Sequence, residues 1–544
     1  MNAYYLLLCL SFIACHQTGR FPEVSVEITD SVVNEHLGGV GFHVFYHVHN
    51  APRWHYEQVF AKRWRELNPS FVRINDDPDW STARLDSVAS YLEVMKDTET
   101  EMYLTSWGTQ VIHNYPDKND YVTHEVDNIA YLKQTKGFDR INYYCMANEL
   151  SLDHWASMLD SLEYFKEVQS LFYEEFKSRE LDIDLLATDA SPFSNWPTIE
   201  WAAEHMDNIT GVYGGHHYIN QHDLFDASFY RFFYNKMKWG ADLAKSKGKH
   251  FIVGEFGSKQ NSNNIEGVRH DAMLYNNTPL ESYAAIQSAE AIIAMINAGV
   301  YGFNYWTFSD FPSNYRPNYI NKWGLFRWEV DNFMTKPGYY CIGLLTKYFR
   351  GPSEALGLVS TDSLIRTAAT RNLETGTISI AVINRHRHSR TLKLHTGPLQ
   401  ADRPLRRYLF DPAEPPFNYF GDLPAPSRII KVEDGQFSDD LPPFSLVVYT
   451  TLYDEVPPAP VTGLNVENRK SEGRDRTFLK WEPSAEADFC YYRIYRSELP
   501  EVEISPERQL AVTIATEYID KSVHGLPEFH YRVIAVDQSG NASE

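Results

Sequence analysis

Cysteine and positive charge are both scarce in this chain of 544 residues. It has five cysteines, and after the first fifteen residues only Cys145, Cys341 and Cys490 remain. These three have neither the spacing of a metal site nor the number of a disulfide framework, so we expect burial to hold the domains together and no redox chemistry. The formal net charge is −22. A nucleic-acid partner needs a basic surface that releases counterions, and this composition excludes such a role.

Long apolar runs are also absent after the first twenty residues, so we predict no transmembrane helix there. Residues 1–20 are predicted to be a signal peptide, because their apolar run at 4–14 is too short to cross a bilayer as a helix. Residues 12–15, Phe-Ile-Ala-Cys, resemble a bacterial lipoprotein box, which implies a lipid anchor on Cys15. A plain secretory signal is the alternative, and the segment before the apolar run lacks the Lys or Arg that either signal normally carries. Both interpretations imply export, and lipidation implies the outer membrane, the cell surface or the periplasm.

Aromatic residues are abundant. Phe, Trp and Tyr make up 14% of the chain, whereas the hydrophobic share of 43% and the charged share of 22% are typical of globular proteins. Flat aromatic faces suit stacking against sugar rings. The length predicts three or four domains, or one large barrel with attachments.

From about residue 36 to 350, short apolar runs alternate with longer amphipathic patterns, which predicts repeated βα units around a parallel sheet. There are eight such runs, the number required for a (β/α)8 TIM barrel. A doubly wound open sheet is the alternative, but no glycine-rich phosphate loop follows the first run. The runs cover residues 39–45, 71–75, 101–106, 141–147, 185–189, 209–214, 250–254 and 300–306.

After Arg350 the pattern changes to short alternating strands, which predicts an antiparallel β-sandwich over residues 351–454. Residues 21–35 alternate in the same way and are expected to add a strand to it. The Pro-rich stretch at 456–460 is expected to be a stiff linker. Residues 455–544 resemble a fibronectin type III domain through Trp481, the strand Tyr-Arg-Ile-Tyr-Arg at 492–496 and the strand that begins near Tyr531. That resemblance implies a spacer or docking module, with direct sugar binding as the alternative.

Two glutamates come directly after apolar runs in the predicted barrel. Asn148 and Glu149 follow the fourth run, and Glu255 follows the seventh. Carboxylates at strand ends cost desolvation energy unless the site requires them, and the carboxyl rim of a barrel is where active sites lie. A pair of carboxyl groups suits glycoside hydrolysis: one protonates the leaving oxygen, and the other attacks or stabilises the anomeric carbon. Separations of about 5 Å imply retention of configuration, and about 6.5–9.5 Å imply inversion.

With these motifs the chain resembles the clan A glycoside hydrolases, a superfamily of retaining (β/α)8 enzymes. Family 39 is the most similar, partly through residues 343–352, and families 86 and 79 share the architecture. The resemblance implies that Glu149 is the general acid/base, Asn148 holds the sugar 2-hydroxyl, and Glu255 in Gly-Glu-Phe-Gly is the nucleophile. Further residues correspond to the family's substrate-binding positions: His217 and Tyr218 in His-His-Tyr at 216–218, Arg73, and Trp306.

Other residues at the predicted rim have two interpretations each. Arg73 could keep Glu255 ionised or form a structural ion pair. Trp306 and Trp107 could be sugar platforms or packing residues. His43, His216 and His217 lack the spacing of a metal motif, so we expect hydrogen-bonding roles, no metal and no cofactor. The remaining rim carboxylates are expected to be solvated or to bind hydroxyls: Asp76, Asp77, Asp79 and Asp310.

The sequence therefore predicts an exported, lipid-anchored, retaining O-glycoside hydrolase that cleaves a β-linked poly- or oligosaccharide. A non-catalytic glycan-binding lipoprotein is the main alternative, and an adhesion protein that acts through its fibronectin-like tail is another. The net acidity argues mildly against a sulfated or uronic chain, but a local basic patch could offset it, because long-range repulsion is screened within about 10 Å. Residues 309–332 are expected to shape the cleft, either as a closed pocket or as one wall of an open groove.

Overall fold

The structure is a computed structural model that describes residues 21–44, 52–76, 80–106, 115, 117–150, 162–219, 222–258, 279–312, 319–399, 402–523 and 528–544. The signal peptide predicted at 1–20, with Cys15, lies outside these residues, as do Asp77, Asp79 and Trp107. Asp76 ends a strand, and only its backbone is described. No helix in the described part of the chain combines the length and the apolarity needed to cross a membrane.

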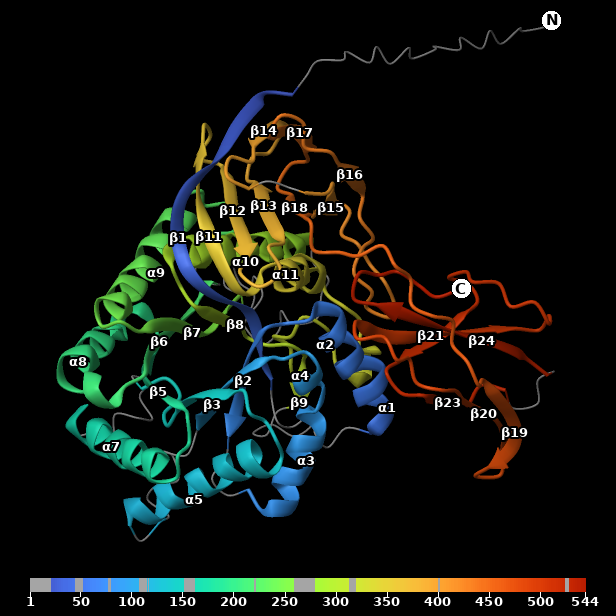
Figure 1. The fold of residues 1–544 in the computed structure, drawn as a ribbon, viewed down its shortest axis with the longest axis horizontal. Coiled ribbons are helices and arrows are strands. Elements are labelled where there is room, and N and C mark those ends of the chain that lie inside the picture. The colour runs from blue at the N-terminus through green and yellow to red at the C-terminus, as the bar shows by residue number, and fades with distance from the viewer. Residues whose placement is uncertain are drawn as a thin grey trace, which may run out of the picture.

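Eight parallel strands close into a barrel, as the eight apolar runs predict (Figure 1). Neighbours pair in chain order from β1 to β8, and β8 pairs with β1 to complete the ring. The (β/α)8 fold class is therefore confirmed. The strands are β1 (Glu23–Val44), β2 (Phe71–Asp76), β3 (Glu101–Ser106), β4 (Ile141–Cys145), β5 (Asp184–Ala190), β6 (Val212–Tyr218), β7 (His250–Gly257) and β8 (Gly302–Tyr305).

Helices surround the barrel because their apolar residues recur at helical spacing and face the strands. In α9, for example, Phe229, Phe233, Met237 and Ala244 are buried. The helices are α1 (Arg53–His55), α2 (Ala61–Leu67), α3 (Thr82–Leu92), α4 (Val94–Asp97), α5 (Lys118–Ala130), α7 (Leu162–Ser178), α8 (Pro197–His205), α9 (Phe229–Ser246), α10 (Pro279–Ala298) and α11 (Pro337–Tyr348).

The first strand belongs to two domains. The N-terminal part of β1 pairs with two sandwich strands, antiparallel to β11 (Arg350–Ser360) and parallel to β14 (Arg390–His395), and its C-terminal part pairs with β2 and β8. Figure 1 shows it running without a break from the sandwich into the barrel. Gly39, at φ 121°, allows the crossing, because a Cβ there would lie 2.1 Å from the Ser70 hydroxyl oxygen. A single strand therefore forms backbone hydrogen bonds in both the sandwich and the barrel.

The sandwich packs its own apolar core between two sheets. Val26, Ile380, Leu392 and Val447 are among its fully buried residues. Most of the strands pair in a row that starts with β11 on one side of β1, and β14 pairs with β1 on its other side and with β17, so β1 joins the two layers. The remaining strands are β12 (Ile365–Asn372), β13 (Ile378–Asn384), β15 (Leu405–Phe410), β16 (Arg428–Ile430), β17 (Gln436–Leu441) and β18 (Leu446–Thr450).

The C-terminal residues form two three-stranded antiparallel sheets around Trp481, Tyr492 and Ile494. This domain lies against the side of the barrel near α2 (Figure 1). Its Arg493 contacts Asp422 at 3.0 Å, and Asp422 also accepts a hydrogen bond from Lys62 of α2. The Pro-rich stretch therefore connects two parts that are in direct contact. The strands are β19 (Asn465–Ser471), β20 (Arg474–Lys480), β21 (Phe489–Ser497), β22 (Gln509–Thr513), β23 (Glu517–Asp520) and β24 (His530–Asp537).

Candidate active site

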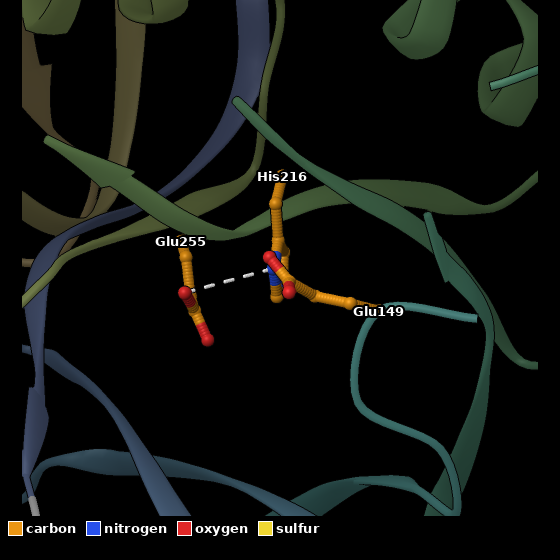
Figure 2. A group of neighbouring side chains, drawn as sticks. All are labelled: Glu149, His216 and Glu255. Atoms are coloured by element: carbon orange, nitrogen blue, oxygen red, sulfur yellow. Dashed lines mark hydrogen bonds and ion pairs between the residues drawn. The ribbon is translucent and has the colours of Figure 1, made fainter. Parts of the chain in front are cut away.

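Three side chains from distant parts of the sequence converge at the carboxyl ends of the barrel strands (Figure 2). Glu149 follows β4, His216 lies in β6 and Glu255 lies in β7. One carboxylate oxygen of Glu149 and one of Glu255 lie within 4.8 Å of each other, and a ring nitrogen of His216 lies within the same distance of both. The two glutamates that the sequence singles out therefore share one site.

Arg73 of β2 is the central cation of this site and is fully buried. Its Nη1 donates to Glu255 Oε1 at 2.6 Å, and its Nη2 donates to Asn148 Oδ1 at 2.6 Å. Nη2 also contacts Asp189 Oδ2 at 2.9 Å. Burial alone would lower the pKa of Arg73, but Asp189 and Glu255 outweigh it and raise that pKa. Both roles considered for Arg73 from the sequence therefore apply. It pairs with Glu255, the proposed nucleophile, and it also forms a structural ion pair with Asp189.

Asp189, the penultimate residue of β5, was not among the sequence candidates. It is fully buried, and its Oδ1 lies 2.8 Å from His216 Nε2. Burial would raise the pKa of Asp189, but His216 and Arg73 lower it to about 2. The signal was present in the sequence, because Asp189 is the last residue of the fifth apolar run, as Glu149 and Glu255 follow the fourth and the seventh. It is the third strand-end carboxylate of the site.

His216 is held as a cation by the carboxylates around it. Burial lowers its pKa, but Asp189 and Glu255 outweigh this effect and raise the pKa to about 9. With both nitrogens protonated, Nε2 faces Asp189 and Nδ1 lies 3.2 Å from Glu149 Oε1. This imidazolium therefore positions Glu149 from the side of β6.

The structure distinguishes the three residues of the His-His-Tyr element. His216 and Tyr218 point into the barrel mouth, and the Tyr218 hydroxyl donates a hydrogen bond to Glu255 Oε2. His217 points the other way: its ring stacks on Phe193 at 3.6 Å, and burial lowers its pKa to about 3. Strand side chains alternate between faces, so residues 216 and 218 share one face and residue 217 takes the other. His217, expected from the sequence to bind substrate, therefore faces away from the two carboxylates, and His216 lies beside them.

Burial and charge act on Glu255 in opposite directions. Its side chain is 3% exposed, and burial raises its pKa above the ordinary value, with a further rise from Glu149. His216, Arg73 and the hydrogen bond from Tyr218 act to lower it. Two cations and one hydroxyl donor thus stabilise the ionised form of this buried carboxylate.

Gly254 makes room for this arrangement. A Cβ there would lie 2.6 Å from His216 Nε2 and 2.7 Å from Asp189 Oδ1, closer than a carbon can approach either atom. The Gly-Glu sequence at the end of β7 is therefore required by the Asp189–His216 pair beside it.

His43 and Trp306 line the wall next to Arg73. His43 Nδ1 lies 3.1 Å from Arg73 Nη1, and the His43 ring packs against Trp306 with centroids 4.3 Å apart. Burial, together with Arg73, holds the pKa of His43 well below its ordinary value, so its Nδ1 accepts a hydrogen bond from Arg73. Trp306 is 5% exposed.

Asp310 does not join the carboxylate pair. It is fully buried, and its Oδ1 accepts hydrogen bonds from the Gly324 amide at 2.8 Å and from Lys336 Nζ at 2.7 Å. Burial raises its pKa to about 6, although Lys336 acts to lower it. Asp310 therefore holds the segment after β8 to the start of α11, and the hydroxyl-binding role expected for it finds no support in these contacts.

Glu149, His216 and Glu255 are spaced closely enough to suggest a metal site. A metal ligand must be a neutral imidazole, whereas His216 is held protonated by Asp189. Arg73, a permanent cation, also forms an ion pair with Glu255. The donor set therefore fits a hydrogen-bonded carboxylate pair better than a cation site.

No family model matches the chain, and the curated proteins searched contain no match. Solved structures do resemble it. A bacterial orthologue of human α-L-iduronidase matches with a TM-score of 0.58 and 14% identity, over 96% of this chain and 99% of that one. A glycoside hydrolase family 30 subfamily 8 xylanase from Clostridium acetobutylicum matches with 0.55 and 11%, over 78% and 99%. A glycoside hydrolase family 39 enzyme from Xanthomonas axonopodis pv. citri matches with 0.53 and 10%, over 80% and 99%. At these identities the likeness concerns the fold.

Proposed function

We propose that this protein is a retaining glycoside hydrolase of the clan A type, with Glu149 as general acid/base and Glu255 as nucleophile. The observation that carries the proposal is the approach of the two carboxylates to within 4.8 Å. Inverting enzymes separate theirs by about 6.5–9.5 Å to admit a water molecule, whereas retaining enzymes hold theirs about 5 Å apart. The glycosidase names of the solved structures that share the fold agree with this assignment.

In the first step, Glu255 attacks the anomeric carbon while Glu149 gives its proton to the leaving oxygen, which forms a covalent glycosyl-enzyme. In the second step, Glu149 takes a proton from water, and that water displaces Glu255 with the original configuration restored. Arg73 and Tyr218 hold the Glu255 carboxylate in place through hydrogen bonds to different oxygens. Asn148, oriented by Arg73, is expected to bind the sugar 2-hydroxyl.

The substrate is proposed to be a poly- or oligosaccharide with β-D- or α-L-linked sugars. The sequence suggested β linkages alone. The α-L linkage is added because two solved proteins with this fold are named an α-L-iduronidase and an α-L-arabinofuranosidase. Trp306 is expected to contact the sugar ring, and the buried His43 packs behind it beside Arg73. Export, and a lipid anchor on Cys15 that holds the enzyme at the cell surface or in the periplasm, are proposed from the sequence alone. The C-terminal domain is proposed to be fibronectin type III-like, because it has two antiparallel sheets around Trp481.

The test is hydrolysis of a panel of β-D- and α-L-linked glycans by the wild type, Glu149→Gln and Glu255→Gln. Each substitution should lower the rate by at least about a thousandfold, since each removes a group needed in the transition state. Glu354→Gln is the matched control, because Glu354 pairs with Arg371 on the sandwich, away from the barrel mouth. Azide should partly restore a Glu149→Ala variant on a substrate with an activated leaving group. Wild-type turnover by Glu255→Gln, or net inversion in the product by NMR, would refute the assignment.

The glycan-binding alternative makes a different prediction. If the site only bound sugar, the wild type would release no product from any glycan that it binds, and Glu255→Gln would bind that glycan as the wild type does. Measuring affinity and turnover on the same panel separates the two functions.

A further inference from the structure

A second cavity lies at the other end of the barrel, where the amino ends of the strands meet the sandwich. It has a volume of about 500 Å³. Its barrel wall includes Glu101 and His250, the first residues of β3 and β7. His250 is five residues before Glu255 along β7, so these two residues are about 16 Å apart along the strand. It is therefore separate from the catalytic site.

One guanidinium in this cavity forms no ion pair with a carboxylate of the described residues, although Glu99 and Glu374 also line the cavity. Arg350, at the start of β11, donates from Nη2 to the Thr98 carbonyl at 3.0 Å, and its Nε is buried without a hydrogen bond. Burial lowers the pKa of Arg350 to about 10, and the nearby carboxylates Glu99 and Glu374 offset this only in part. A largely buried guanidinium in this position favours an anionic partner from outside the chain.

A second guanidinium faces the same space. Arg140, which precedes β4, lines the cavity, and its positive charge acts to lower the pKa of Arg350. Its contact with Glu99 is 3.6 Å long, and both side chains are more than half exposed, so this pair adds little stability. Two like charges are thus held near each other at the mouth, where an anion would relieve their repulsion.

The remaining walls suit a polar ring better than a bare ion. Tyr301 stacks on His250 with centroids 4.4 Å apart, and the Tyr301 hydroxyl donates to Glu101 at 2.7 Å. Neutral hydrogen-bonding residues of a sandwich turn also line the cavity, among them Asn372, Thr375 and Thr377, together with the charged Glu374. Aromatic surface with hydroxyl and amide groups is typical of sugar sites, and the volume is that of a small-molecule pocket.

We propose that this cavity is a non-catalytic binding site for a sugar that carries an anionic substituent, a carboxylate or a sulfate, with Arg350 as its anchor. The proposal does not depend on the glycosidase assignment. It also fits an acidic protein, because the overall negative charge is screened over about 10 Å, whereas the guanidinium contacts the ligand directly.

Ligand-observed NMR on the full-length Glu255→Gln variant provides the test, since that variant should not turn a sugar over. The probes are D-glucuronate, glucose 6-sulfate, D-glucose and inorganic sulfate. At least one of the two anionic sugars should bind, and Arg350→Met should weaken that binding by about tenfold or more, as expected for the loss of a charge-assisted hydrogen bond. Arg179→Met, which removes a guanidinium just after α7 that pairs with Asp127 of α5, should leave it unchanged.

A second variant guards against a structural effect of Arg350→Met. Thr375 is exposed in the turn at the mouth, so Thr375→Trp should obstruct the cavity while leaving the fold and glycan hydrolysis intact. Loss of binding in both variants would support the site. The proposal would be overturned by glucose that binds as tightly as the anionic sugars, by inorganic sulfate that binds as tightly as glucose 6-sulfate, by binding that survives both variants, or by no binding at all.

Discussion

Replacing Asp189 by Asn tests how the site is held together, because the change removes one charge and keeps the shape. Asp189 lies between Arg73 and His216, at 2.9 Å and 2.8 Å, and none of the three side chains is exposed. Because all three side chains are buried, the effect should fall directly on the proton of His216.

The magnitude follows from the pKa of His216. Its rise from 6.5 to about 9 corresponds to about 3 kcal/mol that favours the imidazolium in the folded protein. Asp189 is the largest cause of that rise, so in Asp189→Asn the pKa should fall well below 9. Because the folded pKa is above the unfolded one, the stabilisation is complete below about pH 6.5 and is lost as the pH rises through about 9. In Asp189→Asn, the free energy of unfolding should therefore fall much less over this pH range.

Histidine-selective NMR titration of the wild type and of Asp189→Asn measures the effect directly. The wild type should show one buried histidine that titrates near pH 9, and the variant should not. At pH 7, kcat/KM should fall by roughly a hundredfold, as expected when catalytic groups are misplaced. Asp207→Asn is the control, because Asp207 pairs with Lys249 at the partly exposed start of β7. A histidine that still titrates near pH 9 in Asp189→Asn would refute the role given to this carboxylate.

Three further substitutions test separate parts of the structure. Gly254→Ala should destabilise the protein and abolish activity, since its Cβ would meet the Asp189–His216 pair. Gly338→Ala should keep stability and activity, because the atom nearest to its Cβ would lie 3.4 Å away. Thermal unfolding and an activity assay compare the two variants. Tyr218→Phe removes a donor that lowers the pKa of Glu255, so that pKa should rise, and the acidic limb of the pH profile of kcat/KM should move to higher pH; an unmoved limb would contradict this. Glu290→Gln should lower the free energy of unfolding by about 3–5 kcal/mol and leave the kcat of the folded fraction unchanged, because Glu290 of α10 is buried between Arg366 at 2.9 Å and Arg385 at 3.2 Å. The control is the ion pair of Glu354 with the half-exposed Arg371, which should contribute about 0–1 kcal/mol. Denaturation of Glu290→Gln and Glu354→Gln measures both.

The barrel could be predicted because its signal is local. Each strand is a short apolar run and each helix an amphipathic one, so the eight βα units can be counted along the chain. The double role of β1 could not be predicted, since the sequence on either side of residue 35 gives two separate strand patterns. Only the pairing partners show that they form one strand of 22 residues.

The sequence by itself determined the barrel and the choice of Glu149 and Glu255, because the position of a carboxylate at the end of a strand is a property of the strand alone. Only the tertiary structure decided that these two carboxylates meet, that His216 and not His217 faces them, and that Asp189 joins Arg73 in the site. The physical reason is that such contacts depend on how the strands are tilted and staggered when the sheet closes, and on which face of each strand turns inward. The same closure, together with the sandwich packed beneath it, creates the cavity at Arg350, whose residues lie far apart along the chain.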